Sequence, residues 1–204
     1  KAVYEKEWEH TCEGGPDWKQ YPAWESRFGM EYHELCPDDP DGLRVQVYNE
    51  DGTNNILNVA SEGDIVRMRP GEHSLLLYNN DTEYIVFDDM NSFASAKATT
   101  RTRTRASYAG NPFMGKTAEN TVNAPDMLYG NYIESYTAER KTEIDELPVT
   151  MHPLVFTYLV RYEFSHGLEY VALAHGALAG MAGAVWLNRG RTSEEAATIL
   201  YDCT

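Results

Sequence analysis

The chain has 204 residues, with 32 acidic and 17 basic side chains and a formal net charge of −15 at pH 7. So acidic a chain repels the phosphates of nucleic acids, which excludes a general nucleic-acid binder. Its composition, 42% hydrophobic and 24% charged, is that of a globular protein and excludes a disordered or collagen-like chain. The length allows one large domain or two small ones.

Residues 1–41 contain three of the four tryptophans and form a predicted N-terminal cap segment on a larger body. Trp18, Tyr21, Trp24 and Phe28 recur at offsets of three, three and four, which predicts a short helix with one apolar face. That face could pack on the body of the protein. Alternatively, its exposed rings could stack on sugars, which makes Trp18, Tyr21 and Trp24 candidate glycan-binding residues.

A different pattern begins at residue 43. Apolar and polar side chains alternate over residues 43–48, and the run ends at Asn49-Glu50-Asp51-Gly52, whose Asp-Gly pair suits a tight hairpin turn. Short strands separated by turn residues are predicted to follow at 56–59, 65–68, 72–78, 84–87 and 93–98. This spacing predicts an antiparallel β-sandwich over residues 42–145, in an all-β fold.

The remainder of the chain repeats the β pattern after a loop at 106–126 and a strand at 129–136. Residues 154–164 form the longest alternating run and are predicted to be a strand, and its first half is apolar on both faces, which predicts that this half is buried on both sides. Further strands are predicted at 146–151, 170–173, 183–188 and 196–202. A helix beginning at Thr192 is an alternative for the last of these, because hydroxyls followed by acids favour helix N-termini.

Residues 146–204 are too few for an independent second β-sandwich. We therefore expect a partial sandwich there, with unpaired strand edges that either invite a strand from a partner or mean that the chain continues.

The most apolar window, residues 171–187, could in principle be a membrane span, and it contains the small-residue pair Gly176 and Gly180. As a helix it is shorter than the roughly 30 Å hydrocarbon core of a bilayer. A buried segment of small residues is the favoured interpretation.

Motifs for catalysis are absent from the sequence. It contains no nucleophile elbow, phosphate loop or dinucleotide fingerprint, and its six histidines do not form H-E-x-x-H. The sequence therefore predicts a protein that is not an enzyme and that carries no cofactor.

Metal binding is also disfavoured. The pairs His10/Cys12 and His33/Cys36 match no tight zinc spacing, and the acidic run at 38–41 lacks the regular oxygen positions of a calcium loop. Cys12 and Cys36 could instead close a loop through a disulfide.

One basic run stands out in this acidic chain. Arg101, Arg103 and Arg105 alternate with threonines, so that in a strand their side chains would share one face. Such a ridge usually protects an exposed sheet edge from aggregation. Binding of an acidic ligand or glycan, and a protease-sensitive loop, remain open, so these arginines are candidate ligand-binding residues.

Four segments together resemble one known family. They are PGEHSLLLYNND at 70–81, PDMLYG at 125–130, MHPLVFTYLVRYEF at 151–164 and, most specifically, GALAGMA at 176–182. All four resemble the fimbrillin-like outer-surface lipoproteins of Bacteroidetes. The resemblance implies tandem β-sandwiches of transthyretin-like topology, export, and a lipid anchor on an N-terminal cysteine. It carries over no catalytic residue.

We therefore expect a non-enzymatic cell-surface lipoprotein of fimbrial or adhesion type, held at the outer membrane by its lipid anchor alone. The resemblance implies assembly by β-strand addition with copies of itself or with other fimbrillin-like chains. The alternative is an accessory or glycan-binding lipoprotein that partners an outer-membrane nutrient importer of the SusC/SusD type.

Overall fold

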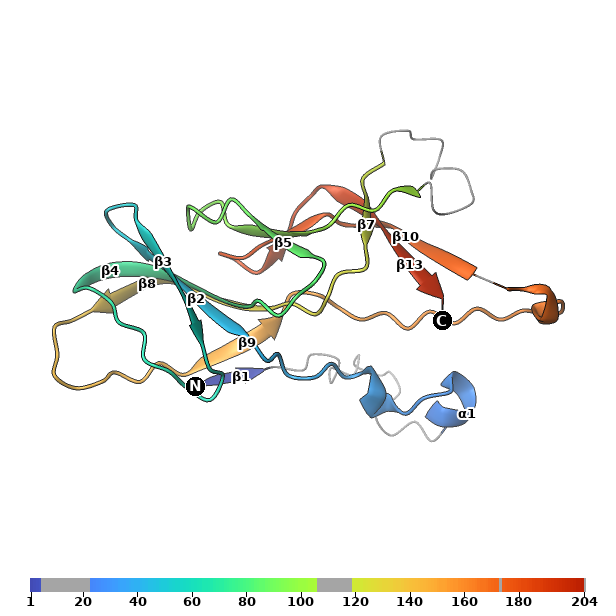
Figure 1. Ribbon diagram of the computed structural model, residues 1–204, viewed down its shortest axis with the longest axis horizontal. Helices are drawn as coiled ribbons and strands as arrows, with labels where there is room; N and C mark the ends of the chain where they lie inside the picture. Colours follow the sequence, from blue (N-terminus) through green and yellow to red (C-terminus); the bar gives the residue numbers. More distant parts are fainter. Residues whose placement is uncertain (5–22, 106–118, 173, 204) are drawn as a thin grey trace, which may run out of the picture.

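The computed structural model describes residues 1–4, 23–105, 119–172 and 174–203 (Figure 1). Within them the fold is built almost wholly from β-strands, which confirms the predicted all-β class. In chain order the helical elements are α1 (Trp24–Phe28), η3 (Tyr32–Leu35) and η6 (Leu168–Tyr170). The strands are β1 (Ala2–Tyr4), β2 (Leu43–Asn49), β3 (Asn54–Val59), β4 (Gly71–Asn79), β5 (Ile85–Asp88), β6 (Lys97–Thr100), β7 (Thr121–Asn123), β8 (Tyr129–Ala138), β9 (Val149–Pro153), β10 (Ala174–Ala182), β11 (Ala184–Trp186), β12 (Arg191–Thr192) and β13 (Ala196–Cys203).

The largest sheet has the strand order β1-β9-β8-β4-β2-β3. Its β2–β3 hairpin closes through the predicted turn, where Asn49 N donates to Thr53 O over 2.8 Å and Gly52 has a φ of 80°. A positive φ of this size costs glycine little, which explains the Asp-Gly signal. Residues within the turn itself therefore account for the shape of this hairpin.

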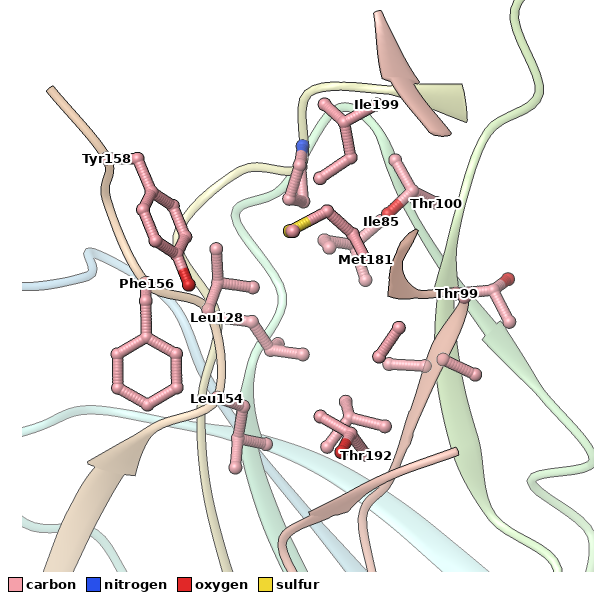
Figure 2. Close-up of a pocket in the computed structure, with 17 residues that line it drawn as sticks. Ile85, Thr99, Thr100, Leu128, Leu154, Phe156, Tyr158, Met181, Thr192 and Ile199 are labelled. Carbon is pink, nitrogen blue, oxygen red and sulfur yellow. The ribbon is translucent and has the colours of Figure 1, made fainter. Parts of the chain in front are cut away.

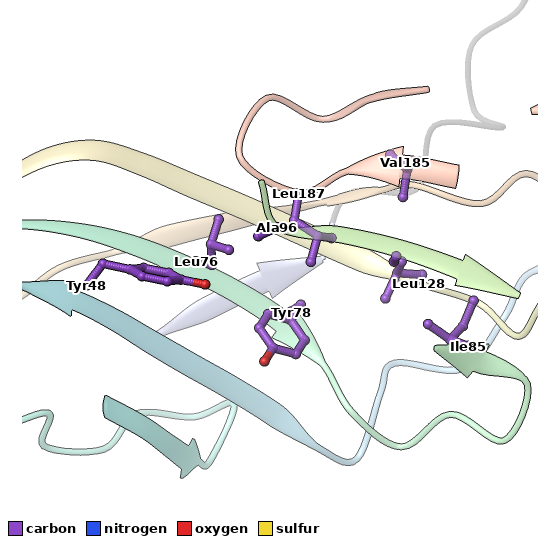
Figure 3. Packing of buried hydrophobic residues seen from close by; sticks show 9 residues of the cluster. Tyr48, Leu76, Tyr78, Ile85, Ala96, Leu128, Val185 and Leu187 are labelled. Atoms are coloured by element: carbon purple, nitrogen blue, oxygen red, sulfur yellow. The ribbon is translucent and has the colours of Figure 1, made fainter. Parts of the chain in front are cut away.

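A four-stranded sheet, β12-β11-β6-β5, faces the six-stranded one across a shared core (Figure 3). Buried members of this core come from both sheets: Tyr48, Leu76 and Tyr78 from the large sheet and Ile85, Ala98 and Val185 from the small one. Tyr48 donates its hydroxyl to Met90 O over 2.9 Å, so the ring is buried without an unpaired polar atom.

The other face of the large sheet carries a second apolar cluster, which includes Val45, Leu75, Leu77 and Met151. No second sheet covers this face in the described structure; β1 and irregular segments lie against it instead. The two faces of the sheet are thus buried by different means.

The remaining sheet has the order β10-β13-β7, with β13 antiparallel to β10 and parallel to β7. Strands from residues 146–204 also join the other two sheets, since β9 pairs with β8 and β11 pairs with β6. Backbone hydrogen bonds therefore cross the position of the predicted boundary at residue 145. The division into a sandwich at 42–145 and a partial one at 146–204 stays a prediction about independent folding.

Three predicted strands are wrong. The strand predicted at 170–173 is absent, because η6 ends at Tyr170 and residues 171–172 form no ladder with any described strand. Residues 65–68 pair with no strand, because the chain must pass from edge strand β3 to β4 on the far side of β2. Residues 154–164, predicted as a strand with a buried first half, are extended but form no ladder with the described strands, and Phe156 is 52% exposed. Leu154 and Val155 at its start do pack on the core between the sheets.

Two further alternatives are settled by the C-terminal strands. The apolar window at 171–187 folds mainly as β10 and β11, and no helix in the described part of the chain is long and apolar enough to cross a membrane. The alternative helix near Thr192 is wrong, because residues 196–203 form β13.

Candidate functional site

The two edges of the six-stranded sheet come together at β1. This three-residue strand pairs in parallel with β9, from Ala2 opposite Val149 to Tyr4 opposite Met151. On its other side, Ala2 N donates to Ser61 O over 3.0 Å, and the hydroxyls of Tyr4 and Ser61 lie 3.3 Å apart. Ser61 lies two residues beyond the end of β3, the opposite edge of the sheet, so these contacts bring the two edges close together without a ladder between them.

A cavity of about 860 Å³ lies within this incomplete closure. Its floor is the inner face of the sheet, including Leu43, Val45 and Leu75, and its walls are residues 60–68 and 138–148. The volume lies in the range of about 300–1,000 Å³ typical of ligand sites. The walls are largely irregular chain, and Ile65 and Ile144 expose 59% and 73% of their surface there.

Carboxylates outnumber cations among the residues that line this cavity. Lys141, one of the cations, lies 3.2 Å from Asp145 and 3.3 Å from Glu139. The hydrogen bonds to Asp145 and Glu139 raise the pKa of Lys141. The positive charge of Lys141 is therefore neutralised by carboxylates of the same loop. The acidic rim consists of Glu62, Asp64, Glu139, Glu143, Asp145 and Glu146, facing the three cations Lys1, Arg67 and Lys141. This arrangement attracts a cationic partner.

A smaller cavity, of about 170 Å³, lies on the other side of the large sheet, beside the four-stranded sheet (Figure 2). Leu128 and Leu154 form part of its wall, and Met181 and Ile199 contribute from β10 and β13. The two cavities share no lining residue.

The arginine run is held by backbone and side-chain bonds to its neighbours. Arg103 forms an ion pair with Asp202 at 3.1 Å, and Arg105 forms one with Glu119 at 2.9 Å. Thr102 bridges to Val122 of β7, so the run borders the three-stranded sheet. Arg101 is exposed. Two of the three charges are thus matched within the protein, and a ligand-binding role for Arg101, Arg103 and Arg105 stays a prediction.

Of the predicted N-terminal cap segment, residues 1–4 and 23–41 are described, and residues 1–4 contain strand β1 of the large sheet. Trp24 begins α1 and is 8% exposed, with its ring 4.6 Å from that of Phe28 and 5.4 Å from that of Tyr32. This burial favours packing over a sugar platform at Trp24. Trp18 and Tyr21 lie outside the described residues, so their binding role stays a prediction.

The cysteines and candidate metal ligands lie only partly within the described residues. Cys36 and Cys203 form no disulfide with each other, and Cys12 lies outside the described residues, so the Cys12–Cys36 disulfide stays a prediction. No cluster of three or more His, Cys, Asp or Glu side chains suited to a metal occurs among residues 1–4, 23–105, 119–172 and 174–203.

Sequence reasoning did not identify the large cavity. Its walls join segments about 80 residues apart, and residues 65–68 were interpreted as a strand. The one available signal was the density of acidic residues at 139–146 next to an apolar strand. Phe156 and Tyr158 were predicted to lie in a buried strand, so their exposure at the small cavity was also missed.

Packed β-sheets, one of them with a face that no second described sheet covers, define an all-β protein. Comparison with known families agrees with this class. A family model described as a domain of unknown function, DUF5119, matches residues 20–202, and the chain belongs to that family.

A relative and a solved structure extend the comparison. The chain is 27% identical over 173 residues to a protein named "Putative fimbrium anchoring subunit Fim4B" from Bacteroides ovatus, covering 84% of this chain and 50% of that protein. It also matches a crystal structure described as a "putative adhesin" from Bacteroides ovatus with a TM-score of 0.61 at 22% identity, covering 84% of this chain and 58% of the other. These matches confirm the resemblance to fimbrillin-like proteins of Bacteroidetes. The chain spans about half the length of the relative and 58% of the length of the solved structure.

Proposed function

We propose that this chain is a non-enzymatic part of a cell-surface fimbrial or adhesin protein that joins its neighbours by β-strand addition. The relative named as a fimbrium anchoring subunit supports the surface and fimbrial parts of this proposal. The proposal is carried by one observation in the structure, the three-residue edge strand β1 beside the cavity of about 860 Å³.

Strand addition requires a sheet edge with unsatisfied backbone groups and pockets for every second side chain. β1 pairs with β9 over only three positions, from Val149 to Met151, of the five residues of β9. A longer incoming strand could displace or extend β1 along β9. Its inward side chains would then enter the cavity above Leu43, Val45 and Leu75.

The charge of the rim specifies the incoming strand further. Six carboxylates line the cavity with three cations, and Lys141 is already paired with two of those carboxylates. A donor segment with Lys or Arg beside its apolar residues would be attracted to this rim, and an acidic one repelled. The donor therefore combines alternating apolar residues with a net positive charge.

Site-specific photo-cross-linking on intact cells tests this function. A photoreactive phenylalanine analogue replaces Ile65 or Ile144, which line the cavity and are 59% and 73% exposed. Ile56, which is 53% exposed on β3 and does not line the cavity, is the matched control position. Adducts with copies of this chain or with other surface subunits, formed from positions 65 and 144 but not 56, are expected.

Other outcomes would contradict strand addition at this site. Adducts with an outer-membrane transporter would support the importer-accessory function instead. Absence of any adduct, or equal adducts from position 56, would exclude the cavity as an assembly site. Incorporation of labelled palmitate by the expressing cells tests the proposed lipid anchor separately.

A further inference from the structure

The small cavity has a wall of exposed aromatic rings. Phe156 and Tyr158 are two positions apart in an extended segment, both line the cavity, and they are 52% and 65% exposed (Figure 2). Side chains two apart in an extended chain point to the same side. Large aromatic rings are normally buried in cores, so two adjacent exposed rings at a cavity mark a surface that can take a ligand.

Hydroxyl groups stand across the cavity from the rings. Thr100 ends β6 and Thr192 ends β12, and Figure 2 shows both on the side of the cavity away from Phe156 and Tyr158. The neighbouring Thr99 already donates its hydroxyl to Asp88 over 3.0 Å. The cavity thus combines an aromatic wall and an aliphatic floor with hydroxyls on its far side.

No charged side chain lines this cavity, although 24% of the chain is charged and its net charge is −15. A cation would find no carboxylate there, and an anion would enter against the field of the whole protein. The lining therefore selects a neutral ligand. Because the rings are flat and the opposite side offers hydroxyls, that ligand should have one apolar face and hydrogen-bonding groups at its edge.

The size of the cavity matches a single six-membered ring. Its volume is about 170 Å³. For comparison, a protein cavity of about 150 Å³ is known to hold one benzene molecule. A six-membered ring fits this space, whereas a folded peptide segment does not.

We propose that this cavity binds one pyranose ring of a neutral glycan, with an apolar face of the sugar on Phe156 and Tyr158 and its hydroxyls toward Thr100 and Thr192. The site is separate from the cavity at β1, so it adds ligand binding to the proposed assembly role and does not depend on it. A chain with both sites could join a surface assembly while holding a sugar.

Saturation-transfer NMR and titration with methyl glycosides of neutral hexoses, together with an array of neutral and acidic glycans, test the proposal on the full chain. We expect at least one neutral hexose to bind, and Phe156→Ala and Tyr158→Ala each to weaken that binding about fivefold or more. Phe164→Ala is the matched control, because Phe164 is 48% exposed in the same extended segment and does not line the cavity. The control variant should bind as the wild type does.

Several results would overturn the proposal. They are a lack of binding to every neutral glycan tested, tighter binding of acidic than of neutral glycans, and an equal loss of binding in the Phe164→Ala variant. A concentration-dependent dimer that Phe156→Ala and Tyr158→Ala abolish, without any sugar binding, would assign the aromatic wall to a protein interface. The cross-links expected from positions 65 and 144 are unaffected by any of these results, so the two proposals fail independently.

Discussion

Gly176 of β10 lies directly against the ring of Tyr201 on the paired strand β13, with which it is in register. A side chain at position 176 would occupy the space of that ring. The ring is in turn held by a hydrogen bond of 2.5 Å between the hydroxyls of Tyr201 and Tyr162. The first glycine of GALAGMA is therefore required by close packing between two strands.

Replacing Gly176 by alanine should lower the free energy of unfolding by about 1–3 kcal/mol, the usual cost of overpacking. The Tyr201 ring would have to move and give up its bond to Tyr162. Urea denaturation of the wild type and the variant measures the loss. The control is Ala177→Ser on the same strand, where the side chain is exposed and a change within about 0.5 kcal/mol is expected. Equal effects at both positions would contradict the packing argument.

The same pair of tyrosines predicts a dependence on alkaline pH. Burial, followed by the hydrogen bond with Tyr162, raises the pKa of Tyr201 to about 12 from its usual value of 10.0. The folded state therefore holds this proton more tightly than the unfolded state does. Its contribution to stability is complete below pH 10 and is lost as the pH rises through about 12.

Absorbance at 295 nm, which reports tyrosinate, measures this titration. Burial also raises the pKa of Tyr48, so more than one tyrosine should ionise late. Tyr162→Phe should lower the pKa of Tyr201 by removing the hydrogen bond that raises it. Tyr170→Phe, at a position 86% exposed, is the control variant and should leave the late phase intact. A late phase unchanged by Tyr162→Phe would mean that the bond is not formed in solution.

Glu119 joins the arginine run to β13. Its removal should lower the free energy of unfolding more than removal of the exposed Asp202, which pairs with the same run. It pairs with Arg105 at 2.9 Å and accepts a hydrogen bond of 2.6 Å from Thr198, a buried residue. Glu119→Ala leaves two donors unsatisfied and should cost about 1–3 kcal/mol. Asp202→Ala removes a more exposed acid, which pairs with Arg103 at 3.1 Å and with His175 at 2.7 Å, and should cost less than about 1 kcal/mol.

Urea unfolding of these two variants decides between a structural role and a binding role for the arginines. If Glu119→Ala proves no more costly than Asp202→Ala, the Arg105 pair is not formed in solution, and Arg105 would be open to an acidic ligand.

Local signals in the sequence predicted the hairpin and several strands, because those depend on neighbouring residues. Asp51-Gly52 fixes the turn after β2, and the alternation over residues 43–48 predicts β2 itself. Residues 154–164 have the same alternation but no ladder, because a strand needs an edge to pair with, and alternation alone does not supply one. The strand predicted at 65–68 is absent for a related reason, because the sheet order sets the path of the chain from β3 to β4.

The motifs behind the family resemblance proved to be structural. In PDMLYG, the carboxylate of Asp126 accepts hydrogen bonds from the backbone N–H groups of Glu83 and Tyr84, at 2.9 and 2.5 Å, and a Cβ on Gly130 would stand 2.6 Å from Leu154. Such residues identify the fold, and they explain why the resemblance located no binding site. Both candidate sites arise where segments distant in sequence meet, which no local pattern reports.

The pairing of β9 with β8 and of β11 with β6 predicts that the described sheets unfold as one unit. Residues 139–146 between β8 and β9 are exposed, so a protease should cut there first. The nicked chain should stay together in native gel filtration, because strands from both sides of the cut share two sheets and one core. It should separate into two fragments only in denaturant, and intact chain should show a single unfolding transition. Fragments that separate without denaturant, or two resolved transitions, would instead establish independent units on either side of residue 145.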